Sequence, residues 1–306
     1  MKKWKKLKRE IIKNRQLYFI VLPVIIFYAV FRYGPMYGSL IAFMDFRPAK
    51  GIWGSDWVGL KHFIRFIQDH YFLRTIRNTI TISVSNIVFS MPAAIILALL
   101  INEIRNTKFQ RVVQTISYLP HFVSLVVICG MLKDFLGSDG IITSILSFLG
   151  IVEMKNLLMV PEYYKTIHVA SGIWQTMGWN SIIYLSAMAG IDQEQYEAAE
   201  LDGAGRFAKM RYITLPSILP TITIMFIMRL GQVMGVGYEK ILLLSNTVNK
   251  ESAEVISSYV YSMSLGSTYP QYSYSAAVGL FSSVINLILV TIGNSLCKKL
   301  NGSGLW

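Results

Sequence analysis

The chain has 306 residues, a length that often forms two soluble domains, but its composition is that of a membrane protein. Charged residues make up 15% of the chain, against roughly 25% in soluble domains, and the mean hydropathy is +0.46. Both cysteines, Cys129 and Cys297, lie in apolar runs. This excludes a disulfide framework and a thiolate metal site.

The net charge of +12 is concentrated at the N-terminus. Eight of the 29 basic residues precede residue 16, with Glu10 as the only acid among them, and this leaves 21 bases against 16 acids in the rest of the chain. A short cationic segment beside an apolar run is typical of contact with anionic lipid, whereas a nucleic-acid site carries its bases along one face. We therefore expect membrane lipid, and no nucleic acid, among the partners.

Six windows are apolar over the roughly 20 residues that a membrane-spanning helix needs. They lie at 17–43, 76–101, 115–136, 166–190, 217–235 and 273–297. The first is predicted to remain in the chain rather than to be cleaved as a signal peptide, because it contains Pro23 and Arg32 and lacks a small-residue cleavage site. The predicted fold class is all-α, a polytopic membrane protein with six transmembrane helices.

The segments between the windows predict the orientation. Placing both termini in the cytoplasm puts 16 basic residues in the inner segments and ten in the outer ones, as the positive-inside rule requires. The outer segment 44–75 mixes charges with tryptophan and phenylalanine, so we expect an interfacial element there. A short helix at the membrane surface is expected within 137–165.

Several kinds of chemistry lack their motifs in this sequence. There is no GxxxxGK[ST] phosphate loop, no GxSxG elbow and no metal-ligand spacing of histidines, so no cofactor is expected on this chain. The only acid inside the six windows is Asp134. This argues against an ion-coupled carrier, although sodium sites built from backbone carbonyls leave that alternative open.

The loop from Ile191 to Pro216 carries the clearest local signals. Asp192 and Gln195 have the spacing of a capping box at the start of a helix, and Gly203 supplies a permissive bend. A second short amphipathic stretch then precedes re-entry into the membrane. The pattern predicts a helix, glycine, helix element, which is either a docking surface for a soluble partner or a solvated loop.

One string in this loop decides between these two interpretations. It contains the residues Glu197-Ala198-Ala199, Gly203, Ile213 and Leu215-Pro216. The sequence resembles binding-protein-dependent ABC importer permeases, because these are the residues of their EAA motif at the same spacing. The resemblance implies a type I ABC importer permease fold and a coupling helix that seats in a cytoplasmic ATPase subunit. It assigns this coupling to Glu197, Ala198, Ala199, Asp202 and Gly203.

Other strings resemble the carbohydrate-uptake branch related to the maltose permeases, and within it the Lpl-type permeases. These strings include LPVIIFYAVFRYGPMYGSLIAF, VGLKHFIRF, YLPHFVS, VISSYVY and the terminal GLW. The resemblance implies a transport subunit, not an enzyme, in a prokaryotic plasma membrane. Its implied partners are a second permease, two copies of an ATPase subunit that holds ATP and Mg, an external solute-binding protein and an oligosaccharide. The competing hypotheses are a secondary carrier acting alone and a membrane-embedded enzyme.

A substrate pathway can be suggested from polar and aromatic residues within the windows. An arginine inside the membrane costs about 2.5–3.5 kcal/mol on insertion scales, so Arg229 should face a wet cavity or polar neighbours. The candidate pathway residues are Trp174, Asn180, Tyr184, Arg229 and Gln232. For each of them, helix packing is the competing interpretation.

Packing is also the favoured role of a small and polar stripe in the last window, formed by Gly279, Ser282, Ser283 and Asn286.

The predicted organisation of the chain has three parts. Residues 1–75 hold the basic tail, the first helix and the outer segment; residues 76–297 form the permease core with the 191–216 loop; and residues 298–306 form a cytoplasmic tail.

Overall fold

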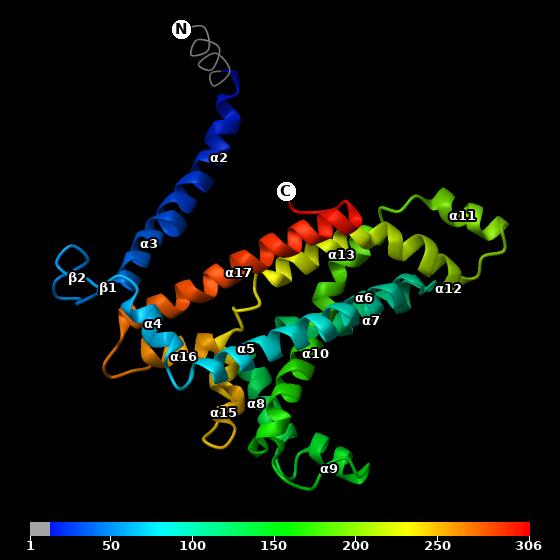
Figure 1. Cartoon of the computed structure of the whole chain (residues 1–306). Coiled ribbons are helices and arrows are strands. Elements are labelled where there is room, and N and C mark those ends of the chain that lie inside the picture. Colours follow the sequence, from blue (N-terminus) through cyan, green and yellow to red (C-terminus); the bar gives the residue numbers. More distant parts are fainter. Residues whose placement is uncertain (1–12) are drawn as a thin grey trace.

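The computed structural model describes residues 13–306, so most of the basic tail lies outside the described residues. The first helix runs without interruption from Arg15 to Phe43 and extends away from the rest of the chain (Figure 1). It consists of α2 (Arg15–Tyr28), the π-helical η1 (Ala29–Tyr33), α3 (Gly34–Met36) and the 3-10 helix η2 (Tyr37–Phe43). The helix predicted at 17–43 is therefore present.

Four helices of the described chain are long and apolar enough to cross a membrane. They are Arg15–Phe43, Phe72–Asn102, Arg206–Leu230 and Tyr272–Leu300, and a bent pair of helices makes a fifth if it is counted as one span. The predicted number of six is not confirmed. The window predicted at 166–190 lies in α10 (Pro161–Met188), which has 28 residues. This helix is long enough to span, but its amide, hydroxyl and charged side chains make it less apolar than the other four.

The window predicted as a span at 115–136 is divided between two helices that meet at a sharp bend. Helix α7 (Thr107–Phe122) ends there, and α8 (Leu125–Phe135) leaves at an angle of 98°. The backbone of Ser124 is extended, and its side chain accepts a hydrogen bond from the Val127 amide at 3.3 Å. Because Ser124 caps a new helix, the apolar run is divided at this point.

Two other long helices contain a π-helical segment. In one, η3 (Asn86–Ser90) joins α5 (Phe72–Ser85) to α6 (Met91–Asn102). In the other, η5 (Met210–Thr214) joins α12 (Arg206–Lys209) to α13 (Leu215–Leu230). Including η1, all three π-helical segments end two residues before a proline, at Pro35, Pro92 and Pro216. A proline has no N–H for the carbonyl four residues earlier, so the wider turn falls where this bond is lost.

The long helices pack through their small residues. A Cβ atom at Gly231, just after α13, would lie 2.6 Å from a methyl carbon of Val290 in α17 (Tyr272–Asn301). In the same way, a Cβ at Gly293 would lie 2.4 Å from a methyl carbon of Leu230. The end of α13 therefore lies directly against the middle of α17. A separate core joins α6, α10 and α13 through Ala98, Tyr184, Met188, Ile218 and their neighbours.

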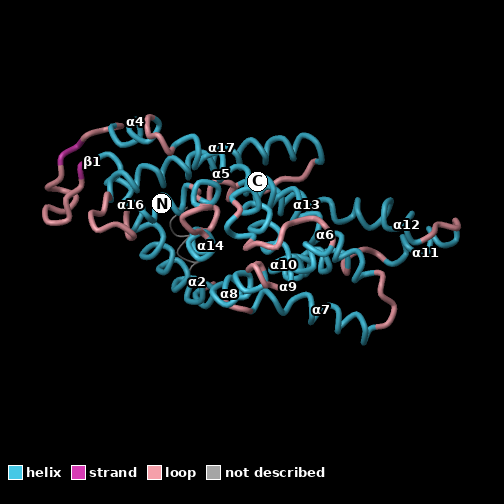
Figure 2. The backbone as a smooth tube through the Cα atoms, turned by 90° about the horizontal axis from the view of Figure 1, so that it is seen from below, coloured by secondary structure: helices cyan, strands magenta, loops and turns pink. Residues whose placement is uncertain are grey.

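Several short elements lie away from α11 (Gln193–Leu201) and α12, and β1, α4 and α16 lie at the opposite end of the molecule (Figures 1 and 2). The segment predicted to be interfacial forms the antiparallel strands β1 (Met44–Asp45) and β2 (Asp56–Trp57), followed by α4 (Lys61–Ile67). The short helix expected within 137–165 is present as α9 (Ile141–Phe148), and η4 (Leu157–Met159) follows it. After α13 come three further short helices: α14 (Tyr238–Leu244), α15 (Lys250–Ala253) and α16 (Ile256–Met263).

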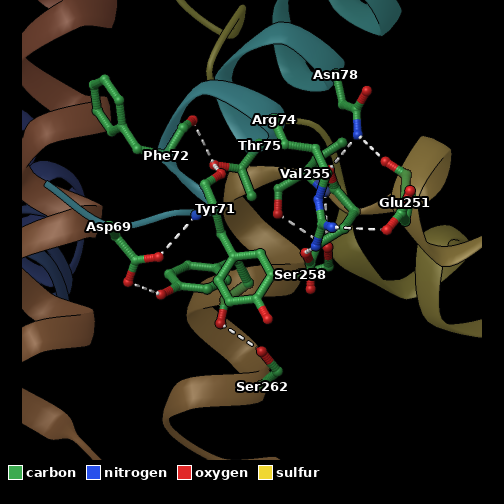
Figure 3. A network of polar contacts seen from close by, with 12 residues as sticks. Asp69, Tyr71, Phe72, Arg74, Thr75, Asn78, Glu251, Val255, Ser258 and Ser262 are labelled. Carbon is green, nitrogen blue, oxygen red and sulfur yellow. Dashed lines mark hydrogen bonds and ion pairs between the residues drawn. The ribbon is translucent and has the colours of Figure 1, made fainter. Parts of the chain in front are cut away.

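Polar contacts attach the start of α5 to α15 and α16 (Figure 3). Arg74 pairs with Glu254 and, at 3.6 Å, with Glu251. Asn78 donates to the backbone carbonyls of both glutamates, at 2.8 and 2.9 Å. Beside this group, the hydroxyls of two tyrosines of α16 and α17 donate to the Asp69 carboxylate, each at 2.8 Å. The α4–α5 turn is thus fixed to segments that lie almost 200 residues later in the chain.

Candidate functional site

The 191–216 loop folds into the predicted helix, glycine, helix element. Asp192 caps α11 by accepting a hydrogen bond from the Glu194 amide at 3.0 Å. The capping box predicted with Gln195 is not the arrangement seen, because the Gln195 amide instead donates to the backbone carbonyl of Asp192 at 3.3 Å. The cap therefore uses the second amide of the helix rather than the third, and a capping side chain can reach either.

Gly203 ends the helix in the left-handed conformation, with φ of +79°. After it, the Ala204 amide reaches back to the Ala199 carbonyl at 2.8 Å, and the Gly203 amide bonds to the Glu200 carbonyl at 3.0 Å. This pair of bonds is the glycine-dependent C-cap of an α-helix. A residue with a Cβ atom would be strained at this position, so the predicted bend is confirmed together with its cause.

Two side-chain contacts hold α11 against the helix that follows it. Lys209 of α12 pairs with Glu200 at 2.5 Å, and this hydrogen bond and charge lower the pKa of the Glu200 carboxyl. The hydroxyls of Tyr196 and the buried Thr214 lie 2.9 Å apart. The two helices of the loop are therefore fixed against each other by side-chain contacts.

This element lies at one end of the molecule (Figure 1), and most of its residues from Gln193 to Phe207 are exposed. Glu197, Ala198, Asp202 and Gly203 are exposed, and Ala199 is half-buried. Next to them, Leu201 is 91% exposed and Phe207 is 74% exposed. Large apolar side chains exposed beside carboxylates are typical of a protein docking surface. The structure thus brings the five predicted coupling residues together on one exposed element.

Arg229 and Gln232 line a common cavity of about 250 Å³. Its walls come from α5, η3, α10, the end of α13 and α14. Besides the two predicted residues, polar groups reach it from Asn86, Ser90, His168, Gln175, Thr176 and Lys240. The π-helical turn η3 contributes Asn86 and Ser90, as irregular helix turns often do at functional sites. Arg229 therefore faces a cavity lined by polar groups, and its role in the substrate pathway stays a prediction.

Lys240 is the charged residue among those that line this cavity and were not predicted as pathway residues. Its side chain is buried, and its ammonium group donates to the backbone carbonyl of His168 at 2.9 Å. Burial lowers the pKa of Lys240 to about 8. The available signal was a lysine inside the apolar stretch YEKILLL, where a charge is costly unless it has a partner.

The other three predicted pathway residues do not line this cavity. Trp174 lines a separate apolar cavity of about 760 Å³ among α8, α9 and α10. Tyr184 is 2% exposed in the core with α6 and α13, and Asn180 is half-buried outside both cavities. The predicted aromatic face of α10 is therefore a packing face at Tyr184. The adjacent face, which carries Gln175 and Thr176, lines the polar cavity.

The small and polar stripe of α17 includes one clear packing contact. Asn286 accepts a hydrogen bond from the Met234 amide at 2.9 Å and so holds the segment after α13 against α17. Ser282 and Ser283 donate to carbonyls of their own helix at 3.1 and 3.0 Å. These contacts agree with the packing role favoured for the stripe.

Residues 90–301 match the family described as "Binding-protein-dependent transport system inner membrane component". This range includes the 191–216 loop and most of the cavity wall. Among curated proteins, the chain is 40% identical over 305 residues to the polygalacturonan/rhamnogalacturonan transport system permease protein YteP of Bacillus subtilis (strain 168), covering 99% of this chain and 94% of YteP. It is also 40% identical over 296 residues to Protein LplB of the same organism, covering 96% of this chain and 92% of LplB.

Solved structures give the same result. The chain is 37% identical to a chain of a bacterial ABC transporter involved in the import of the acidic polysaccharide alginate, with a TM-score of 0.85 and coverage of 96% of this chain and 99% of the other. A bacterial alginate ABC transporter in complex with an alginate pentasaccharide-bound periplasmic protein matches with 36% identity and a TM-score of 0.87, covering 98% of this chain and all of the matched chain. The chain therefore belongs to the binding-protein-dependent transport system inner membrane components and is a permease subunit of an ABC importer.

Proposed function

We propose that this permease forms half of the pathway through which an ATP-driven importer carries an oligosaccharide across a prokaryotic plasma membrane. Support for the cargo comes from the relatives, since YteP is named for polygalacturonan and rhamnogalacturonan and the matched transporters for alginate. The polar cavity around Arg229 and Gln232 is the part of this chain that we assign to the sugar. Its amide and hydroxyl groups are the partners that sugar hydroxyls need.

The observation that carries this proposal is the exposed 191–216 element. It presents Glu197, Leu201 and Asp202 on a braced helix, while the sequence holds no phosphate loop of its own. A transporter driven by ATP must then obtain its energy from a separate chain. We assign the exposed element to contact with the ATPase subunit, of which two copies would serve two permeases.

A second permease is proposed to complete the pathway. Its support is the large apolar surface that the described helices leave uncovered, including the first helix from Arg15 to Tyr37 and the outer faces of α7. In a membrane, lipid covers part of such a surface, and a homologous subunit would cover the part beside the cavity.

The orientation rests on how α13 and α17 are paired. Because Leu230 meets Gly293 and the helices run antiparallel, the C-terminal end of α17 lies on the side of α12 and the coupling loop. We therefore place the C-terminus in the cytoplasm together with that loop, and the α4, α15 and α16 end toward the external solute-binding protein. The N-terminus is proposed to be cytoplasmic because of its basic tail.

The test is reconstitution of the chain with a second permease, the ATPase subunit and the binding protein in proteoliposomes. The expected result is uptake of a labelled oligosaccharide only when ATP, the ATPase subunit and the sugar-loaded binding protein are all supplied. An empty-vesicle control measures leakage. Uptake by the purified chain alone, driven by a sodium or proton gradient, would contradict the proposal and support a secondary carrier.

A further inference from the structure

The cavity around Arg229 contains a second cationic side chain, Lys240, and no aspartate or glutamate is among the described residues that line it. Neither cation forms an ion pair within the described part of the chain. Buried positive charges normally have an anionic partner, because removing a charge from water is costly. The two cations in this cavity therefore lack the countercharge that a folded protein usually supplies.

The Lys240 ammonium lies at the cavity wall and not behind it. A Cβ atom built on Gly172 would lie 3.6 Å from Lys240 Nζ and 3.8 Å from Asn86 Oδ1, and all three residues line the cavity. The carbonyl of His168 accepts one hydrogen bond from this ammonium, which has three protons to donate. Lys240 is thus held in place by the protein and still has donors for a ligand.

A third buried group with free hydrogen-bonding capacity faces the same region. His168 is 6% exposed and lines the cavity, and its Nδ1 atom has no hydrogen-bond partner in the protein. Buried polar side-chain atoms nearly always have a hydrogen-bond partner, so this atom is a further group available to a polar ligand in the cavity.

We propose that Lys240 and Arg229 together form an anion subsite that binds the carboxylate of a uronic sugar unit, with Lys240 as the residue that determines this specificity. The inference rests on the proposed function and deepens it by naming the class of sugar. A guanidinium binds a carboxylate through two parallel hydrogen bonds, and an ammonium adds a point charge. The side chains of Gln175, Thr176 and Gln232 are left for the ring hydroxyls.

The competing role for Lys240 is structural, because its bond to His168 attaches α14 to α10. The two roles predict different effects on uptake when the charge of Lys240 is removed. A structural lysine affects every cargo equally, whereas a carboxylate-binding lysine affects charged cargo and spares neutral cargo. The appropriate pair of ligands is a uronic oligosaccharide and its methyl ester, which have the same chain length and differ in charge.

The first experiment compares the parent complex with Lys240→Met and with Lys133→Met, a matched change at an exposed lysine of α8. The affinity of the binding protein for the uronate and for its methyl ester is measured first. Uptake of each sugar is then measured at a saturating concentration of the loaded binding protein. Loss of a charge-assisted contact should reduce uronate uptake by about tenfold or more. Uptake of the methyl ester should remain within about twofold of the parent, and Lys133→Met should change neither.

A second pair of variants tests the subsite without removing Lys240. Gly172→Asp places a carboxylate beside Lys240 Nζ from a position where the Cβ atom makes only ordinary contacts. Gly172→Asn has nearly the same shape and no charge. We expect Gly172→Asp to abolish the preference for uronate over the ester and Gly172→Asn to retain it. This comparison holds even where Lys240→Met fails to assemble.

The outcomes separate this inference from the proposed function. If the parent complex transports no oligosaccharide with ATP, the proposed function fails, whereas ATP-driven uptake of another, neutral oligosaccharide without uptake of the uronate overturns the anion subsite alone. If the parent transports sugar but Lys240→Met lowers uptake of uronate and ester equally, or Gly172→Asp and Gly172→Asn behave alike, the anion subsite is overturned while the proposed function remains. Recovery of uronate preference in Lys240→Arg would further support the role of the charge.

Discussion

The backbone of Gly178 in α10 lies directly against Ser117 in α7, since a Cβ atom at Gly178 would stand 2.0 Å from the Ser117 carbonyl oxygen. No side chain other than hydrogen fits there without a backbone shift. This contact holds α7 beside the helix that supplies one wall of the polar cavity. Glycine at such positions permits close helix approach in membranes.

Gly178→Ala should therefore destabilise the permease by about 1–3 kcal/mol, the usual cost of overpacking. The measurement is the thermal unfolding midpoint of the purified chain in detergent. Gly130→Ala is the control, because nothing lies within 4 Å of a Cβ atom at Gly130 in α8. Equal midpoints for the two variants would show that α7 and α10 separate easily.

A second prediction concerns the pair of Arg74 and Glu254. The Glu254 side chain is 10% exposed, so Arg74→Met leaves a largely buried carboxylate without its partner. The expected loss of stability is up to about 3–5 kcal/mol, and Arg74→Met combined with Glu254→Gln should recover part of it. Unfolding midpoints of the single and double variants measure this coupling.

The control for that pair is Lys155→Met, which removes the ion pair between Lys155 and Glu153 on the surface. Their side chains are 46% and 84% exposed, and exposed ion pairs contribute about 0–1 kcal/mol. If Lys155→Met destabilised the chain as much as Arg74→Met does, the ion pair of Arg74 in Figure 3 would contribute no more to stability than an exposed surface pair.

The topology is tested by labelling single cysteines in a background without Cys129 and Cys297. Lys108, Gly205 and Lys299 are exposed and are expected to be cytoplasmic, whereas Val248 is expected to be external. An impermeant maleimide applied outside intact cells should label a cysteine at 248 and leave the other three unlabelled until the cells are opened. The reverse pattern would invert the orientation. Asn249 is unsuitable as a probe because it is fully buried.

Continuous apolar runs made four of the spans predictable from the sequence, for example 17–43 and 273–297. The bend at Ser124 was missed because an average over a window of about 20 residues hides one capping side chain. In the coupling loop, local rules were sufficient: Asp192 and Gly203 act on their own neighbours within a few residues.

The cavity could be predicted only in part. Arg229 stood out because a charge inside an apolar window is costly, and Gln232 follows three residues later on the same helical face. Lys240, His168 and Asn86 come from three other elements and meet only through tertiary packing. Trp174 and Tyr184 were selected for their residue type, but their helix presents them to an apolar cavity and to the core.

The role of the 191–216 loop in ATPase coupling is tested most directly by sugar-stimulated ATP hydrolysis in the reconstituted complex carrying Glu197→Lys and Gly203→Val. Glu197→Lys reverses a charge on the exposed helix face, and Gly203→Val places a branched side chain at a φ of +79°. Glu153→Lys, a charge reversal at an 84% exposed side chain away from the loop, is the control. We expect the double variant to fold and insert but to lose ATPase assembly, stimulation and uptake together, while the control retains all three. Normal sugar-stimulated ATP hydrolysis in the double variant would contradict the assignment of the 191–216 loop to ATPase coupling.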